Sequence, residues 1–152
     1  MNHVDLKCAC WIIPLVDPAK RRTVLERTRV RIAGLGAFDA IAFTGLSGSV
    51  IAGAISIAMD KYLYCVRKST ENRHSDYAVE GPATGLRYVI IDDFISTGAT
   101  IKRVIEMVGA HTDGQAVCAG VYLWRDDVLL AGVPKDEDYW YYPDACPSKI
   151  TT

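Results

Sequence analysis

Two adjacent carboxylates, Asp92 and Asp93, stand directly after an apolar run, and a short stretch of hydroxyl groups around one glycine follows them. An ionised carboxylate accepts hydrogen bonds, and neighbouring hydroxyls of a sugar can donate them. Residues 96–100 (STGAT) should lead into a helix, whose unpaired N–H groups and positive dipole end suit a phosphate. This order of residues indicates a ligand that carries vicinal hydroxyls and a phosphate, such as a ribose 5-phosphate.

A second glycine-containing turn follows another apolar run, in residues 43–49 (FTGLSGS). Its spacing matches neither a P-loop nor a complete dinucleotide fingerprint, so the turn alone predicts little. In an open α/β sheet, ligands bind just beyond the carboxyl ends of the strands. If the strands that end at Thr44 and Asp92 lie side by side, both turns face one ligand.

The apolar pattern predicts the elements that would bring these turns together. Asp17 is a candidate N-cap, and Pro18 a candidate first residue, of a basic helix. The chain then forms two βαβ units, which predicts an α/β fold with an open, mainly parallel twisted sheet flanked by helices. The expected ranges are 18–33 for the basic helix, 39–45, 46–60 and 62–66 for the first unit, and 86–93, 96–111 and 115–124 for the second.

Composition limits the class of protein. The 152 residues are 50% apolar and 23% charged, which suits a single domain over residues 1–152. The net charge of −1 gives no global reason to bind nucleic acid or an anionic membrane, although arginines at 21, 22, 27, 29 and 31 could form a local patch. The longest apolar run, residues 50–59, is about half of the roughly 20 residues that cross a bilayer, and no leader is recognised, so we expect a cytoplasmic protein.

Residues 88–100 (YVIIDDFISTGAT) resemble the phosphoribosyl pyrophosphate signature of the type I phosphoribosyltransferases, in which two adjacent acids end an apolar strand and a hydroxyl- and glycine-containing loop follows. The resemblance implies that Asp92 and Asp93 hold the ribose hydroxyls. It also implies that the turn after the earlier strand binds the pyrophosphate through main-chain N–H groups. The implied 5′-phosphate loop is Ser96, Thr97, Gly98, Ala99 and Thr100, and the implied pyrophosphate loop is Thr44, Gly45, Leu46, Ser47 and Gly48.

Basic residues after the strand at 62–66 resemble the orotate branch of this family. There, an Arg-Lys pair ends the strand, and a mobile loop with Lys and His closes over the pyrophosphate. The pair in this chain is Arg67 and Lys68, a flexible loop is expected over residues 67–86, and Arg73 stands where a lysine is typical. The implied catalytic residues are Arg67, Lys68, Arg73 and His74.

The reaction that the resemblance implies is displacement of pyrophosphate from the anomeric carbon of the ribose by a base nitrogen. Mg²⁺ is the implied cofactor, held through the substrate, with Asp92 and Asp93 as the candidate protein ligands. Family members that act on 6-oxopurines usually have an aspartate at the position of Ser96. Its absence favours an orotate or adenine-type acceptor.

The base would lie in a small hood built from residues 1–16 and 125–152. Trp140, Tyr141 and Tyr142 in the second segment could stack on the base or could only pack, since such rings bury a large area. Many relatives are dimers, so the partners that we expect are phosphoribosyl pyrophosphate, a nucleobase and a second copy of the chain.

A different class of function stays open on the same fold. A non-catalytic regulator could keep the donor site and sense nucleotides or phosphoribosyl pyrophosphate. The presence of Arg67, Lys68 and His74 favours the enzyme, and the near-neutral charge does not favour a nucleic-acid partner.

Overall fold

The computed structural model describes residue 8 and residues 12–68 and 76–138, and the statements below concern these residues. They form a six-stranded sheet with the strand order β3-β2-β1-β4-β5-β6. The four inner strands are parallel, and the two edge strands are antiparallel to their neighbours. The strands are β1 (Ala40–Phe43), β2 (Tyr62–Val66), β3 (Val79–Glu80), β4 (Arg87–Asp92), β5 (Val117–Leu123) and β6 (Val128–Ala131).

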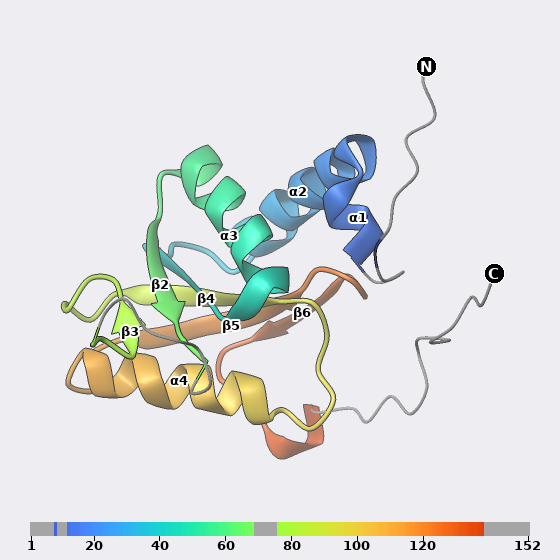
Figure 1. Ribbon diagram of the computed structural model, residues 1–152. Coiled ribbons are helices and arrows are strands. Elements are labelled where there is room, and N and C mark those ends of the chain that lie inside the picture. Colours follow the sequence, from blue (N-terminus) through green and yellow to red (C-terminus); the bar gives the residue numbers. More distant parts are fainter. Residues whose placement is uncertain (1–7, 9–11, 69–75, 139–152) are drawn as a thin grey trace.

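Helices cover both faces of this sheet (Figure 1). Two long helices lie on one face, and α4 lies on the other, where Ile101, Val104 and Val108 are buried against the strands. This spacing of three and four residues is the apolar stripe of a surface helix. The helices are α1 (Ile13–Val16), α2 (Pro18–Ala33), α3 (Gly45–Met59), α4 (Ala99–His111) and the 3₁₀ helix η2 (Asp136–Asp138).

The predicted α/β fold with a mainly parallel sheet is therefore confirmed. The helix predicted over 18–33 begins where expected, because the Asp17 carboxylate accepts hydrogen bonds from the N–H groups of Ala19 (2.9 Å) and Lys20 (3.2 Å). β1 is buried along its whole length, as an inner strand covered on both faces should be.

Two short edge strands were not predicted. β3 lies within the segment 67–86 and β6 within the segment 125–152. A two-residue strand has no period to detect, and β6 follows a tight turn at Asp127, whose φ is 55°. The predicted start of the helix at 96–111 was also wrong: α4 begins at Ala99, because Gly98 adopts the left-handed conformation (φ 76°) just before it.

The topology creates a crevice where the two turns meet. β1 and β4 pair in parallel, with Ala40 opposite Tyr88 and Ala42 opposite Ile90, so both strands end at the same edge of the sheet. The chain leaves β1 into α3 on one face and leaves β4 into α4 on the other. Ligands of open α/β sheets bind at such a point. The strands that end before Thr44 and at Asp92 therefore lie side by side, as a shared ligand site needs.

Candidate active site

A cavity of about 450 Å³ lies at this edge of the sheet. It combines the turn after β1, the second residue after the end of β2, the acid pair and the loop before α4. Of the predicted site residues, Gly45, Gly48, Arg67, Thr97, Gly98 and Ala99 do not line it, and Phe94 lines it without having been predicted. The lining residues are Thr44, Leu46, Ser47, Lys68, Asp92, Asp93, Phe94, Ser96 and Thr100.

The acid pair is held rigidly by the main chain. Asp92 ends β4 and is only 6% exposed. Its Oδ1 accepts a hydrogen bond from the N–H of Asp93 at 2.9 Å, and the Oδ1 of Asp93 accepts one from the N–H of Phe94 at 3.0 Å. On the β5 side, the N–H groups of Trp124 and Arg125 donate to the carbonyls of Asp92 (3.0 Å) and Asp93 (3.3 Å). Both carboxylates therefore have fixed positions before any ligand arrives.

The electrostatic state of Asp92 is unusual for a carboxyl group. Its pKa is raised to about 7, mainly by burial and next by the charge of Asp93, while the hydrogen bond from Asp93 N–H and the charge of Lys68 act in the opposite direction. A buried carboxylate of this kind gains from hydroxyl donors or a cation, which favour its ionised form. A strongly perturbed group in a cavity is a candidate for a functional site.

Two helices begin at this cavity, and neither has a side-chain cap. Gly45 (φ 67°) opens α3 and Gly98 (φ 76°) precedes α4, so each glycine supplies a left-handed turn that other residues adopt at a cost. The hydroxyl of Thr44 is buried and has no hydrogen-bond partner among the described residues. Uncapped N–H groups and the positive helix end make both turns suitable for phosphate groups.

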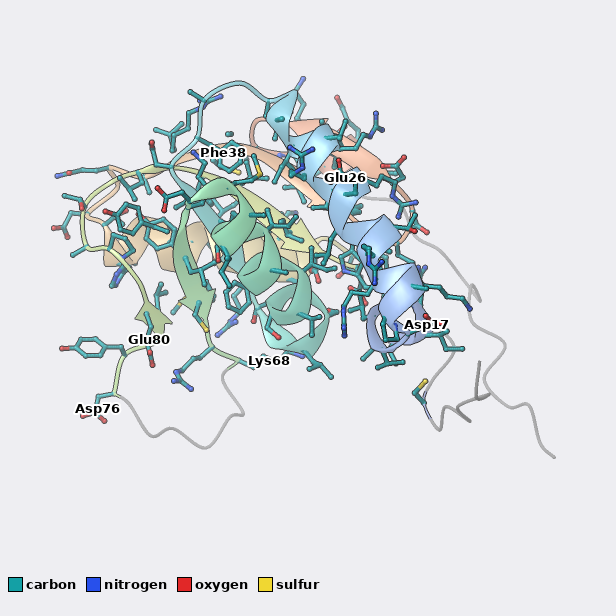
Figure 2. All side chains as sticks on the ribbon, turned by 90° about the horizontal axis from the view of Figure 1, so that it is seen from above. Asp17, Glu26, Phe38, Lys68, Asp76 and Glu80 are labelled. Carbon is teal, nitrogen blue, oxygen red and sulfur yellow. The ribbon has the colours of Figure 1, made fainter. Side chains whose placement is uncertain are left out.

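Lys68 is the basic residue that lines the cavity. A Cβ at Gly45 would lie only 2.9 Å from Lys68 Cε and 3.1 Å from Lys68 Nζ, so the glycine leaves room for the lysine to lie across the start of α3. Lys68 and Asp76 flank the undescribed residues 69–75 (Figure 2). The predicted residues Arg73 and His74 lie outside the described residues, as do Trp140, Tyr141 and Tyr142 and most of the proposed hood.

Arg67 is held away from the cavity by the edge strand β3. Its Nη2 and Nε lie 2.5 Å and 3.0 Å from Oε1 of Glu80, and its N–H donates to the carbonyl of Ala78 (3.0 Å). The guanidinium of Arg103 on α4 donates to the carbonyl of Arg67. The structure thus fixes the end of β2 and places the lysine, rather than the arginine, beside the acid pair.

The side chains present limit how this site could hold a metal ion. Among the described residues, no group of three or more His, Cys, Asp or Glu side chains could hold a metal ion. Mg²⁺ is commonly bound by one or two carboxylates together with substrate phosphates and water. Asp92 and Asp93 fit that arrangement, in which the ligand supplies the remaining oxygens.

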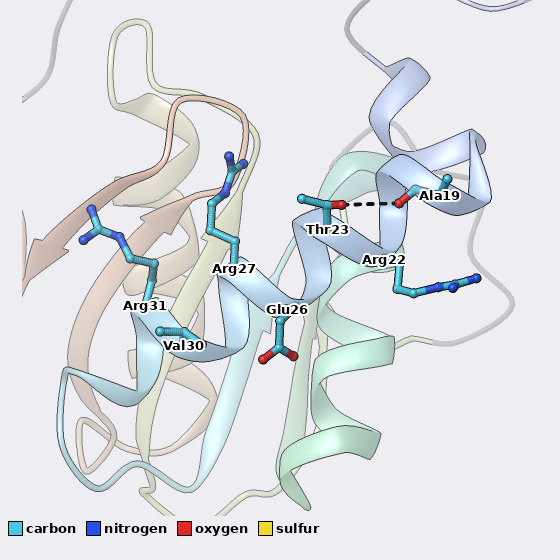
Figure 3. Close-up of a pocket in the computed structure, with 7 residues that line it drawn as sticks. All are labelled: Ala19, Arg22, Thr23, Glu26, Arg27, Val30 and Arg31. Atoms are coloured by element: carbon cyan, nitrogen blue, oxygen red, sulfur yellow. Dashed lines mark hydrogen bonds between the residues drawn. The ribbon is translucent and has the colours of Figure 1, made fainter.

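Another cavity, of about 720 Å³, lies along α2 (Figure 3). Its lining includes Arg22, Arg27 and Arg31 together with Glu26 and Val30. All its lining residues belong to this one helix, and none lies at a strand end. Its charges are partly paired, because Glu26 binds Arg29 (2.7 Å) and Asp127 lies 3.0 Å from Arg31 and 3.8 Å from Arg27. Although this cavity is larger, it has neither the acid pair nor the uncapped helix starts that line the smaller cavity at the edge of the sheet.

Comparisons with known proteins support this assignment. No family model matches the chain. The chain is 34% identical over 115 residues to an adenine phosphoribosyltransferase of Arthrobacter sp. (strain FB24), and 35% identical over 78 residues to an orotate phosphoribosyltransferase of Cenarchaeum symbiosum (strain A). In sequence, the chain is similar to phosphoribosyltransferases. The two matches cover 64% and 51% of this phosphoribosyltransferase-like chain, and the chain spans 62% and 39% of the length of these relatives.

Solved phosphoribosyltransferases share the fold. An adenine phosphoribosyltransferase from Thermoanaerobacter pseudethanolicus superposes with a TM-score of 0.58 at 19% identity, covering 72% of this chain and 70% of that one. An orotate phosphoribosyltransferase from Mycobacterium tuberculosis, in complex with phosphoribosyl pyrophosphate, superposes with a TM-score of 0.56 at 20% identity, covering 72% and 61%. Among the described residues of this chain, no helix is long and apolar enough to cross a membrane.

Proposed function

We propose that this chain is a phosphoribosyltransferase that moves the 5-phosphoribosyl group of phosphoribosyl pyrophosphate to a nucleobase nitrogen and releases pyrophosphate. The observation that carries the proposal is the cavity in which the acid pair lies between two uncapped helix N-termini. The acid pair accepts hydrogen bonds, and the two helix N-termini offer N–H donors to phosphate groups. The donor has the matching order of phosphate, vicinal hydroxyls and pyrophosphate.

Each part of the donor has a place in this proposal. The ribose 2′- and 3′-hydroxyls donate to Asp92 and Asp93, and the 5′-phosphate accepts from the turn at residues 96–100. The pyrophosphate accepts from the turn at residues 44–48, beside Lys68. The side chains of Ser96 and Thr100 line the cavity and add hydroxyl donors, whereas Gly98 contributes through its left-handed backbone.

The chemistry is a displacement in which positive charge grows on the sugar and negative charge grows on the leaving pyrophosphate. Lys68 stabilises the leaving group, as a preorganised charge at the place where charge develops. Mg²⁺, when bound through the donor and the acid pair, supplies further positive charge to the pyrophosphate. Arg67, Arg73 and His74 remain proposed contributors, and Arg67 would first have to leave Glu80.

The proposal also covers the acceptor base, the segments around the site, the oligomeric state and the cellular location. Ser96 stands where 6-oxopurine enzymes usually have an aspartate, and the two curated relatives are an adenine and an orotate phosphoribosyltransferase, so an orotate or adenine-type acceptor is favoured. The same proposal includes a hood from residues 1–16 and 125–152, and closure of residues 67–86 to exclude water. It also includes a homodimer and a cytoplasmic location.

Pyrophosphate release tests this function. The protein is incubated with phosphoribosyl pyrophosphate, Mg²⁺ and, separately, orotate, adenine, uracil and hypoxanthine. Release that depends on one base, with formation of the matching nucleotide, is expected. The double variant Asp92→Asn/Asp93→Asn serves as the control, and it should lose donor binding and turnover while keeping the circular dichroism spectrum. A wild-type protein that binds the donor but transfers to none of these bases would contradict the proposal.

A further inference from the structure

The sheet itself does not fix the position of Lys68. β2 ends at Val66, so this lysine lies beyond the last strand residue, and it is exposed. A cation stabilises a developing charge best when it is preorganised, because a mobile side chain must first be ordered. The contacts that hold the main chain just before Lys68 therefore decide how well the lysine can serve the donor site.

Contacts from two elements hold Arg67, the residue directly before Lys68. On the side of the edge strand β3, its N–H donates to the carbonyl of Ala78 at 3.0 Å, and its guanidinium pairs with Glu80. On the other side, its carbonyl accepts a hydrogen bond from Nη2 of Arg103 on α4. This carbonyl belongs to the peptide bond that joins Arg67 to Lys68. The hydrogen bond from α4 therefore acts directly on the main chain that carries the lysine.

Arg103 has no carboxylate partner in the described part of the chain. None of the ion pairs found there includes it. It is half-buried, whereas its neighbour Lys102 is exposed and pairs with Asp136 at 2.6 Å. A guanidinium only donates hydrogen bonds, and a bond from a charged donor is stronger than one between neutral groups. This arginine therefore makes a strong hydrogen bond to a main-chain carbonyl rather than to an acid.

Arg103 also lies close to the start of α4. Thr100, in the first turn of this helix, lines the donor cavity. Residues three apart are neighbours on a helix surface, so Arg103 lies about one turn further along the same side. It joins the helix that begins at the proposed 5′-phosphate turn to the main chain that carries the proposed pyrophosphate lysine. In the proposed function, these two elements hold opposite ends of the same ligand.

We propose that Arg103 is a positioning residue, whose hydrogen bond to the carbonyl of Arg67 holds Lys68 at the pyrophosphate end of the donor site. The inference rests on the proposed function and adds a residue that this function does not use. Arg103 does not line the donor cavity, so its effect on the ligand passes through Lys68. Loss of the hydrogen bond frees the peptide before Lys68. It leaves the turn at residues 96–100 in place, because that turn depends on the backbone of Gly98.

Binding of the two halves of the donor, measured separately by titration calorimetry with Mg²⁺ present, tests this role. Arg103→Gln should raise the dissociation constant of inorganic pyrophosphate by about fivefold or more. It should leave that of ribose 5-phosphate unchanged, which also shows that the variant is folded. Lys102→Gln is the matched control and should change neither constant, because it removes the same charge from the same helix but its partner is Asp136. Equal weakening or loss of both ligands in Arg103→Gln would overturn the inference, since Arg103 would then support α4 in general.

A double-mutant cycle shows whether the effect passes through Lys68. Lys68→Gln should weaken pyrophosphate binding, and adding Arg103→Gln to it should weaken binding no further. Losses that multiply in the double variant would mean that Arg103 acts on the ligand directly, and they would contradict the inference. Pyrophosphate binding that Arg103→Gln leaves unchanged would contradict it as well. A wild-type protein that binds neither pyrophosphate nor phosphoribosyl pyrophosphate would instead remove the proposed function on which the inference rests.

Discussion

Asp92 accepts hydrogen bonds from the ribose hydroxyls best when it is ionised, yet its burial favours the protonated form. Its pKa of about 7 means that the ionised fraction rises roughly tenfold between pH 6 and pH 8. We therefore predict that the dissociation constant of phosphoribosyl pyrophosphate, measured by titration calorimetry, falls about tenfold over this range. Inorganic pyrophosphate is the control, because it lacks the ribose and reports only the titration of phosphate groups. Equal pH profiles for the two ligands would contradict this account of Asp92.

The same carboxyl group should lower the stability of the protein above neutral pH. Because the pKa of Asp92 is higher in the folded state than in the unfolded state, the folded state binds more protons, and the free energy of unfolding falls as pH rises from about 4 to about 7. Asp92→Asn removes this cost and can still accept the hydrogen bond from Asp93 N–H. We predict that it raises the free energy of unfolding by about 1–3 kcal/mol at pH 8, and by less at pH 5. Urea unfolding at pH 8 measures this difference. A variant that is less stable than the wild type would show that burial of the ionised carboxylate does not lower the free energy of unfolding.

At the scale of single elements, the start of α4 depends on one backbone conformation. Gly98 has a φ of 76°, which costs other residues about 1–2 kcal/mol. Gly98→Ala should lower the free energy of unfolding by about that amount and weaken donor binding, because the N–H groups before the helix are re-aimed. Gly109→Ala is the control in the same helix, where a Cβ meets nothing within 4 Å. It should add about 0.5–1 kcal/mol and leave donor binding unchanged. Identical behaviour of the two variants would argue against a phosphate site at this turn.

The start of α3 depends on close packing as well as on the left-handed φ of Gly45. A Cβ at Gly48 would lie 3.0 Å from the carbonyl oxygen of Ile91 and 3.0 Å from the Cβ of Phe43, so the helix approaches both strands next to the acid pair. Gly48→Ala should push this helix end outward and destabilise the protein by about 1–2 kcal/mol.

Gly53 provides the comparison for this packing within α3, because a Cβ there meets nothing within 4 Å. Gly53→Ala should stabilise the protein slightly, and thermal unfolding separates the two variants. A stabilised Gly48→Ala protein would mean that α3 can shift without cost. In that case, packing would not require glycine at residue 48.

At the scale of the whole molecule, local signals predicted the elements but not every contact between them. The Asp17 cap and Pro18 fixed the start of α2, and the acids marked the end of β4, because those signals are local. The packing of α2 on the end of β5 gave no such signal. It depends on contacts between residues far apart in the sequence, such as the hydrogen bond from Arg27 to the carbonyl of Trp124. Arg67 was predicted at the site, but pairing of the short strand β3 turns it toward Glu80.

The most direct test of the central claim is a crystal structure of the protein soaked with phosphoribosyl pyrophosphate and Mg²⁺. The account predicts the ribose hydroxyls within hydrogen-bond distance of Asp92 and Asp93, and the 5′-phosphate against the N–H groups of residues 96–100. It also predicts the pyrophosphate beside Lys68 and the start of α3. Clear density for the donor at another place, with the acid pair still bonded only to its own main chain, would contradict it.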